Sequence, residues 1–303
     1  MGPTGHLCSM ELSQYSVAAK LWALIDTAKI GPRAIARLLI EFGSVDGIYL
    51  AQVGRLAPSI DAGGAFLGLD AAELLMEKLE ALDIRITTVF DMSYPEGFRE
   101  LNDPPPLIFH RGALPIEGQR VVGVAGSRAT REPGIADAVL FGRLMARDGV
   151  KIVTGLCGGV NSSTVVGALS ENGVAYAVTA GGLAGENPPD LGALARQIVT
   201  TGALIGEYPL TIPAGMKLIE AEASANRLLV SLPQAVVIAE LSDDSVGARD
   251  VAKCCHELGK TLFLLIPERG LTLSESTLGE LTECGAIPIS FPSEVNTIIK
   301  CLG

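Results

Sequence analysis

Two glycine-containing turns, each following an apolar run, carry the residues of this sequence that could bind an anion. The first run ends in Gly126-Ser127-Arg128 and the second in Thr154-Gly155. Backbone N–H groups at such turns and at helix N-termini bind anionic groups, and an arginine can pair a phosphate through two hydrogen bonds. The turns therefore predict an anion-binding site, although neither matches the dinucleotide pattern G-x-G-x-x-G or the phosphate-loop pattern G-x-x-x-x-G-K-[ST].

The candidate binding residues come from these turns and from a later helical segment. They are Gly126, Ser127, Arg128, Thr154, Gly155, Gly158, Gly159, Asn161, Lys217, Asn226 and Arg227. Structural alternatives stand beside them: the hydroxyls could cap turns, Arg128 could pair with Glu240, and Arg227 could make a structural hydrogen bond. Lys217 could be a solvated surface lysine. A binding role is favoured for Arg128, because it shares its position after a strand with the glycines.

A regular alternation of strands and helices positions these turns. Strand-like runs lie at 84–90, 107–110, 121–125, 152–153, 176–179, 203–207, 236–240, 262–266 and 287–289, and later helical segments at 191–199, 214–230, 246–258, 276–284 and 293–301. Strands that are apolar throughout, with helices between them, indicate an α/β fold with a doubly wound parallel sheet buried on both faces. Such sheets bind ligands at the carboxyl ends of their strands, where both turns are expected.

A smaller helical domain is expected before this sheet. Helical periodicity on either side of Ile30-Gly31-Pro32-Arg33 resembles a helix–hairpin–helix (SAM-like) layout, which can set backbone amides against a phosphate. Lys29 stands where that turn usually has its first glycine, so a helical domain that only packs is an equal alternative. We expect a mobile tail at 1–15, a helical domain at 16–83 and the α/β domain at 84–303. A helix at 71–82 should bury Leu74, Leu75, Leu79 and Leu82.

Composition and charge exclude several classes of protein. The 303 residues are 48% hydrophobic and carry a net charge of −11, which disfavours a broad cationic surface for nucleic acid and leaves room only for a local basic patch. No apolar run reaches the roughly 18 residues of a membrane span, and the first residues lack the layout of a secretory signal. We therefore expect a cytoplasmic protein that makes no membrane contact.

Catalytic, metal and cofactor sites find little support. The histidines are His6, His110 and His256, and none lies beside a serine or cysteine in a nucleophile motif. Cys254-Cys255-His256 cannot converge on one ion, because adjacent helical side chains point about 100° apart. Asp243-Asp244 could mark a metal or ribose contact, but a solvated loop is preferred. We expect no catalytic residue, no metal and no cofactor.

The order of several short motifs resembles the DprA/Smf family of DNA-processing proteins. These are Tyr94-Pro95, Asp103-Pro104-Pro105, Gly126-Ser127-Arg128, Thr154-Gly155-Leu156, Glu207-Tyr208-Pro209 and Asn226-Arg227. The resemblance covers about residues 21 to 289 and implies a Rossmann-like domain that binds single-stranded DNA as a homodimer. It further implies loading of a RecA-type recombinase during natural transformation (competence and DNA recombination), without catalytic chemistry.

Several positions depart from the family's pattern; residues 245–251, for example, replace its S-G-x-L-I-T-A motif. Asn161 and Val165 stand where the family usually has an aspartate and a histidine, and Glu222 and Ala225 replace an aromatic residue and an arginine. The lost aromatic removes base stacking and the lost arginine removes a contact to the DNA backbone.

Three functions follow, in order of preference. The first is a single-stranded DNA-binding recombination mediator, and the alternative is a Rossmann-like sensor of a nucleotide-derived small molecule. The third is a hydrolase of nucleotides that uses Glu207 or Glu240. Apolar residues near the C-terminus exceed what one sheet face needs and favour a homodimer; these are Leu258, Leu278, Leu281, Ile298 and Ile299.

Overall fold

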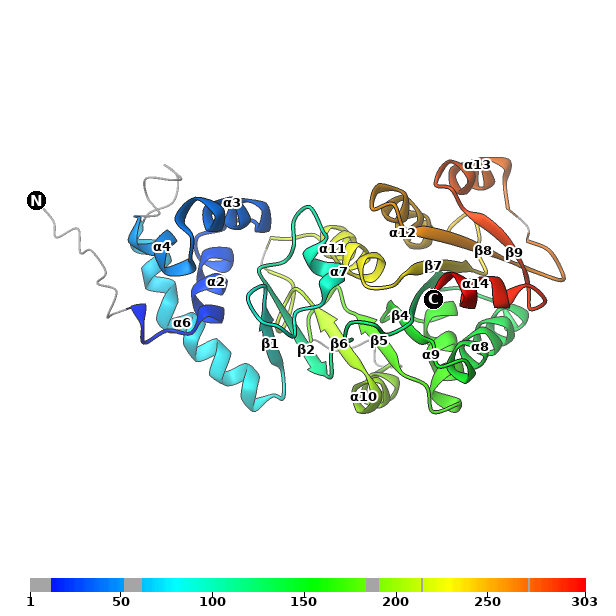
Figure 1. Cartoon of the computed structure of the whole chain (residues 1–303), viewed down its shortest axis with the longest axis horizontal. Coiled ribbons are helices and arrows are strands. Elements are labelled where there is room, and N and C mark those ends of the chain that lie inside the picture. The colour runs from blue at the N-terminus through cyan, green and yellow to red at the C-terminus, as the bar shows by residue number, and fades with distance from the viewer. Residues whose placement is uncertain (1–11, 52–61, 184–190, 214, 272) are drawn as a thin grey trace, which may run out of the picture. The chain divides into compact units, whose positions relative to one another are not determined.

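The computed structural model describes residues 12–51, 62–183, 191–213, 215–271 and 273–303. The chain divides into two compact units (Figure 1): Met1–Tyr94 with Arg99–Phe109, and Pro95–Phe98 with His110–Gly303. This division puts residues 84–94 and 99–109 with the N-terminal unit, whereas the sequence pattern places them in the α/β domain. Most of the expected tail, residues 1–11, lies outside the described residues. Of the rest of it, Leu12 is buried and the Tyr15 hydroxyl donates a hydrogen bond to Asp70.

The N-terminal unit is mainly helical. Its helices are α2 (Val17–Asp26), α3 (Pro32–Phe42), α4 (Val45–Leu50) and α6 (Ala62–Ala81), followed by strand β1 (Arg85–Thr88). Ser16 caps α2, since its hydroxyl oxygen accepts a hydrogen bond from the Ala19 N–H. Pro32 begins α3, where its missing N–H costs nothing. The edge of Trp22 packs on Phe109, with ring centroids 5.4 Å apart.

Helix α6 corrects the buried face expected at 71–82. Leu74 and Leu82 are exposed by 67% and 38%, whereas Leu69, Ala72, Met76 and Leu79 are buried. The buried residues recur every three or four positions along one side of the helix, the side that packs against α2. Leu79 is buried as expected, but the rest of the expected face was wrong because it weighed leucines alone, while the buried stripe includes an alanine and a methionine.

Within the described residues, the C-terminal unit contains seven parallel strands joined by helices. The strands are β3 (Val121–Gly126), β4 (Lys151–Gly155), β5 (Ala175–Val178), β6 (Ala203–Gly206), β7 (Ala235–Ala239), β8 (Thr261–Pro267) and β9 (Ile287–Phe291). The helices are α8 (Glu132–Arg147), α9 (Val160–Ser170), α10 (Gly192–Thr201), α11 (Leu218–Ser231), α12 (Val246–Glu257), α13 (Glu275–Glu283) and α14 (Val295–Cys301). Two further elements, α7 (Glu96–Arg99) and β2 (Leu107–Gly112), have residues in both units. The expected α/β class with a parallel sheet is confirmed.

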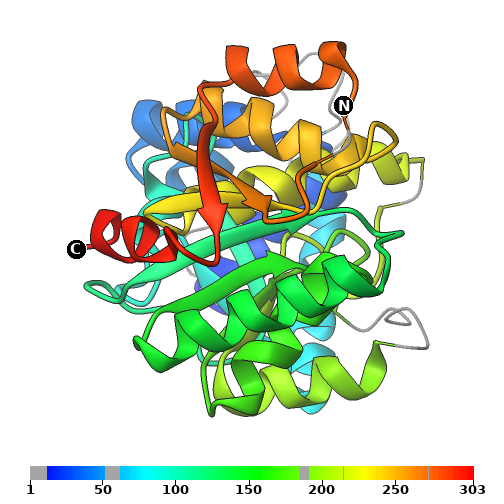
Figure 2. The same cartoon turned by 90° about the vertical axis from the view of Figure 1, so that its right-hand side faces the viewer.

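Both faces of this sheet are covered. Figure 2 shows α8 and α9 on one side and α11 and α12 on the other. Phe141 and Met145 of α8 pack with Phe263, Phe291 and Ile298 in one fully buried cluster. Two-sided burial explains why these strands are apolar throughout.

The C-terminal apolar residues are largely buried within the chain. Leu281 and Ile298 are buried, Ile299 packs against the core cluster, and only Leu278 is strongly exposed. They therefore do not form the surplus apolar surface from which a homodimer was expected. No helix within the described residues is both long and apolar enough to cross a membrane.

The strand order defines where a ligand should bind. It is β6-β5-β4-β3-β7-β8-β9, so the chain leaves β3 toward β6 and then returns to add β7 on the other side of β3. The register sets Val124 beside Thr154 and Gly126 beside Ala239. The order therefore reverses between β3 and β7, and open α/β sheets bind ligands at the carboxyl ends of strands at such a point.

Candidate functional site

The turn after β3 is tied to the end of β7. The Ser127 N–H donates a hydrogen bond of 2.9 Å to the Glu240 carbonyl oxygen. The Ser127 hydroxyl oxygen accepts from the Ala129 N–H at 3.3 Å, and the side chain is buried. Glu240 has a positive φ of 45°, which is costly for a residue with a side chain. These contacts therefore fix the backbone conformation at the point where the strand order reverses.

The turn after β4 lies directly against the turn after β3. The Val160 N–H, at the start of α9, donates to the Ser127 carbonyl oxygen at 3.0 Å. Gly159 has a φ of 72°, and a Cβ atom added there would lie 2.2 Å from the Ser127 oxygen and 2.6 Å from the Arg128 oxygen. Only glycine permits this approach. The two turns singled out in the sequence therefore come together at the N-terminus of α9.

Two polar side chains of the predicted site have internal partners. The Thr154 hydroxyl donates to the Val124 carbonyl oxygen at 2.7 Å, inside the sheet. The Asn161 amide donates to the Gly155 carbonyl oxygen at 3.3 Å. Within the described part of the chain, Asn161 Oδ1 is buried and has no hydrogen-bond partner. Thr154 is therefore placed to hold β3 and β4 together, while Asn161 keeps one acceptor unused.

Arg128 pairs with Glu222 of α11 rather than with Glu240, the partner considered from the sequence. Its Nη2 lies 2.9 Å from Glu222 Oε1, and the two side chains are 64% and 35% exposed. Glu240 instead pairs with Arg269, which also pairs with Asp137. The actual partner of Arg128 lies 94 residues away along the chain, so sequence spacing could not identify it.

Cys157 belongs to the same cluster. Burial raises the pKa of its thiol, the Arg128 charge and hydrogen bond lower that pKa, and Glu222 raises it. The sequence analysis did not include Cys157 in the site, although it lies within the glycine turn. It considered Glu222 only as the residue that replaces the family's aromatic residue. Arg269 was also missed, although its place just after a strand was a usable signal.

The remaining predicted site residues lie on or beside α11. Arg227 Nη2 donates to both carboxylate oxygens of Glu207 at 2.8 Å, and the two side chains are only 16% and 10% exposed. Lys217 is exposed and precedes the first turn of α11, where its N–H donates to the Glu220 carboxylate. Asn226 is half-buried. The Arg227–Glu207 pair joins α11 to the segment after β6.

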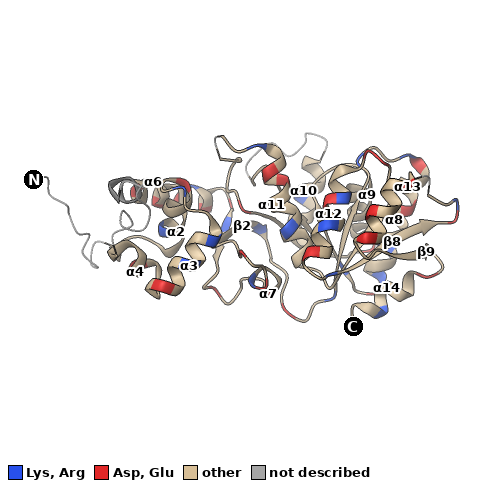
Figure 3. Cartoon of the chain, turned by 90° about the horizontal axis from the view of Figure 1, so that it is seen from above, with Lys and Arg blue, Asp and Glu red and all other residues tan. Residues whose placement is uncertain are grey.

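Charges of both signs surround the site. Figure 3 shows acidic and basic residues together on α11 and α12. Arg128, Arg227 and Arg269 each pair with at least one carboxylate. The arrangement therefore offers one exposed, exchangeable guanidinium beside a glycine turn and a helix N-terminus. Such a site is suited to one phosphate group at a time, in a small anion or in a nucleic-acid strand.

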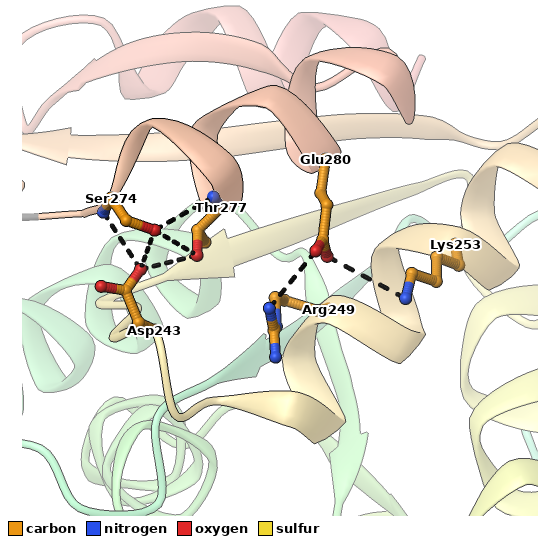
Figure 4. A network of polar contacts seen from close by, with 6 residues as sticks. All are labelled: Asp243, Arg249, Lys253, Ser274, Thr277 and Glu280. Carbon is orange, nitrogen blue, oxygen red and sulfur yellow. Dashed lines mark hydrogen bonds and ion pairs between the residues drawn. The ribbon is translucent and has the colours of Figure 1, made fainter.

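Asp243 lies in an exposed loop, as preferred from the sequence, and its carboxylate also makes structural hydrogen bonds. Figure 4 shows its carboxylate accepting hydrogen bonds from the Ser274 N–H at 3.1 Å, the Ser274 hydroxyl at 2.9 Å and the Thr277 hydroxyl at 2.6 Å. Glu280 bridges back to Arg249 and Lys253 of α12. Among the described residues, no group of three or more His, Cys, Asp or Glu could hold a metal ion.

Replacing Asp243 with alanine should lower the melting temperature at pH 7. Hydrogen bonds from Thr277 and Ser274 lower the pKa of Asp243 in the folded chain. A carboxylate with a lowered folded pKa stabilises the fold above its unfolded pKa and loses this effect as pH falls through the folded value. The difference in melting temperature between the wild type and Asp243→Ala should therefore begin to shrink below about pH 4 and vanish only below the lowered folded pKa. Asp244→Ala is the matched control, and equal melting of both variants at pH 7 would contradict the assignment.

Comparison with known protein families identifies a match over most of the C-terminal unit. The model of a family described as DNA recombination-mediator protein A matches residues 85–300. Protein Smf of Escherichia coli is 32% identical over 203 residues, covering 67% of this chain and 53% of that protein. The putative DNA processing protein DprA of Mycobacterium tuberculosis is 30% identical over 260 residues, covering 80% and 66%. The chain spans about half the length of the Smf proteins of Synechocystis and Escherichia coli, 48% and 53%.

Solved structures share the fold. DNA processing protein A from Streptococcus pneumoniae superposes with a TM-score of 0.75 at 21% identity, covering 92% of this chain and 97% of that one. DNA processing protein A from Helicobacter pylori, described with a single-stranded DNA binding mode, gives a TM-score of 0.58 at 23% identity, covering 71% and 96%.

Proposed function

We propose that this chain, which belongs to the DNA recombination-mediator protein A (DprA/Smf) family, binds single-stranded DNA as a recombination mediator. Membership of the family supports a role in DNA recombination. The observation that supports DNA binding here is Arg128 at the point where the strand order reverses: its backbone lies against Gly159, and its exposed guanidinium reaches Glu222 and Cys157. This is the position at which an open α/β sheet binds an anionic ligand.

A phosphate of the DNA backbone is the group that this site would take. Arg128 supplies a charged donor pair, and the N-terminus of α9 supplies backbone N–H groups and the positive end of the helix dipole. Lys217, exposed before α11, would add a second, weaker attraction. Arg227 and Thr154 support the site structurally, because Arg227 pairs with Glu207 and the Thr154 hydroxyl donates to the Val124 carbonyl oxygen.

Two partners belong to the same proposal. The mediator would act on a RecA-type recombinase and would do so as a homodimer, as the family resemblance implies. Light scattering at micromolar concentration tests the dimer, and the mass of a monomer would count against it.

Labelled oligothymidine should bind with low-micromolar or better affinity in a fluorescence anisotropy titration. The salt dependence should be shallow, since Arg128 and Lys217, with Arg227 counted only as an upper limit, could neutralise at most about three phosphates at roughly 0.7 of slope each. Arg128→Ala should weaken binding about tenfold, or about 1.4 kcal/mol, the size of one charge-assisted contact.

Arg143→Ala is the matched control, because Arg143 pairs with Glu171 at the far end of α9. Equal affinities of the Arg128 and Arg143 variants would remove Arg128 from the site. No binding of oligothymidine by the wild type at about 50 mM salt would refute the DNA function.

The second candidate, a sensor of a nucleotide-derived molecule, is favoured by one observation. Asn161 Oδ1 is a buried acceptor without a partner among the described residues, and a donor group on a small ligand could satisfy it. This function would be established if a nucleotide raised the melting temperature of the protein and oligothymidine did not bind. Hydrolysis through Glu207 or Glu240 is not proposed, since both carboxylates pair with arginines.

A further inference from the structure

Among the described residues, two ion pairs join α11 to the segments that follow β3 and β6, and they differ in burial. In the Arg227–Glu207 pair one Nη2 bonds both carboxylate oxygens, and the side chains are 16% and 10% exposed. In the Arg128–Glu222 pair a single 2.9 Å contact joins side chains that are 64% and 35% exposed. An exposed ion pair with one contact contributes little to stability and opens readily. The second pair is therefore exchangeable, whereas the first is part of the fold.

A carboxylate and a phosphate present the same kind of oxygen pair to a guanidinium. Glu222 therefore makes with Arg128 the contact that a phosphate would make. The two acceptors carry the same sign of charge, so they cannot share the guanidinium without repulsion.

We propose that Glu222 is an internal competitor for Arg128, which a phosphate ligand must displace before it can bind. Glu222 thereby sets the affinity and the salt response of the site. This inference rests on the proposed function in one respect only: it takes the ligand to bear a phosphate, whether in a DNA strand or in a small molecule.

The competition changes what a substitution should do. Removing a carboxylate from an ordinary ion pair weakens a protein's interactions, but here it should strengthen ligand binding. It should also steepen the salt dependence, because in the wild type Arg128 is already compensated before the ligand arrives. The change in slope should approach the roughly 0.7 expected for one additional phosphate contact on a single strand.

The test compares the full-length wild type with Glu222→Gln, which keeps the side-chain shape and removes the charge. Glu222→Gln should bind labelled oligothymidine about three- to tenfold more tightly. Glu171→Gln is the matched control, because it also removes one carboxylate from arginine partners but lies at the other end of α9. Its affinity should equal that of the wild type.

A double variant separates competition from general repulsion. In the Arg128→Ala background the gain from Glu222→Gln should fall below about twofold, since the guanidinium for which Glu222 competes is gone. A gain that persists in full would show that Glu222 acts only through its charge, and would overturn the proposal.

The pKa of Cys157 can be used to probe the Arg128–Glu222 pair in the absence of ligand. Burial is the main reason that the pKa of its thiol is raised; Arg128 opposes this rise and Glu222 adds to it. Glu222→Gln should therefore lower the pKa of Cys157 and shift its alkylation by iodoacetamide to lower pH. Mass spectrometry of the Cys157 peptide measures this shift separately from the other cysteines.

The outcomes distinguish this proposal from the DNA function. If oligothymidine binds through Arg128 but Glu222→Gln binds no better, the competitor is refuted and the DNA function stands. If neither protein binds oligothymidine, inorganic pyrophosphate is the second probe. Tighter pyrophosphate binding by Glu222→Gln then supports the competitor while the DNA function fails. No gain for either probe, or an unchanged Cys157 profile, overturns the proposal.

Discussion

Gly159→Ala is expected to lower the free energy of unfolding by about 3 kcal/mol. Two effects add up at this position. The φ of 72° is a conformation that residues with a side chain rarely adopt, and the new Cβ would lie 2.2 Å and 2.6 Å from two backbone oxygens. Neither oxygen can rotate away as a flexible side chain would, so the turns after β3 and β4 must separate. Urea denaturation followed by circular dichroism measures the loss.

The adjacent glycine provides the control. A Cβ atom at Gly158 would meet nothing within 4 Å, and its φ is not positive in the left-handed range. Gly158→Ala should therefore change the free energy of unfolding by no more than about 0.5 kcal/mol. Equal stability of the two variants would mean that the contact between the two turns does not form in solution.

The parallel sheet could be predicted from the sequence because its strands are buried on both faces. The apolar run at 121–125 became β3 (Val121–Gly126), and the run at 203–207 became β6 (Ala203–Gly206). Helix ends were less accurate. The helix expected at 214–230 begins at Leu218, because the Lys217 N–H is capped by Glu220 and the apolar pattern does not show such a cap.

The candidate site was predictable in position but not in its pairings. Glycines after two neighbouring strands led to the turns that meet at Gly159, because parallel strands end at the same edge of a sheet. The partners of Arg128 and Arg227 are 94 and 20 residues away and follow no period. Ion pairs over such separations depend on how helices pack, so the sequence suggested Glu240 where the structure has Glu222.

The pairings also divide the arginines into two classes. Arg128 is exposed and is joined to Glu222 by one contact, so its loss should alter ligand binding while the fold persists. Arg227 is nearly buried and bonds both oxygens of Glu207, so its loss should act first on stability. The sequence placed both residues in one binding set, and a stability measurement can separate them.

Arg227→Met should lower the free energy of unfolding by about 3 to 5 kcal/mol. Methionine preserves much of the buried volume, but it leaves the Glu207 carboxylate without this guanidinium at a site where only 10% of the side chain is exposed. A carboxylate in such surroundings loses far more by the removal of a partner than an exposed one does. Urea denaturation measures the loss, and Arg128→Met, at the exposed pair, is the matched control with an expected change below about 1 kcal/mol.

A second substitution tests the physical cause. Arg227→Met with Glu207→Gln removes both charges, so the double variant should recover part of the stability that Arg227→Met loses. Recovery would show that the stability lost in Arg227→Met arises from a poorly compensated buried charge on Glu207. Arg227 would then have a structural role at the site. If Arg227→Met instead melts like the wild type and binds oligothymidine more weakly, then the Arg227–Glu207 pair opens to the ligand and Arg227 joins Arg128 as a phosphate-binding residue.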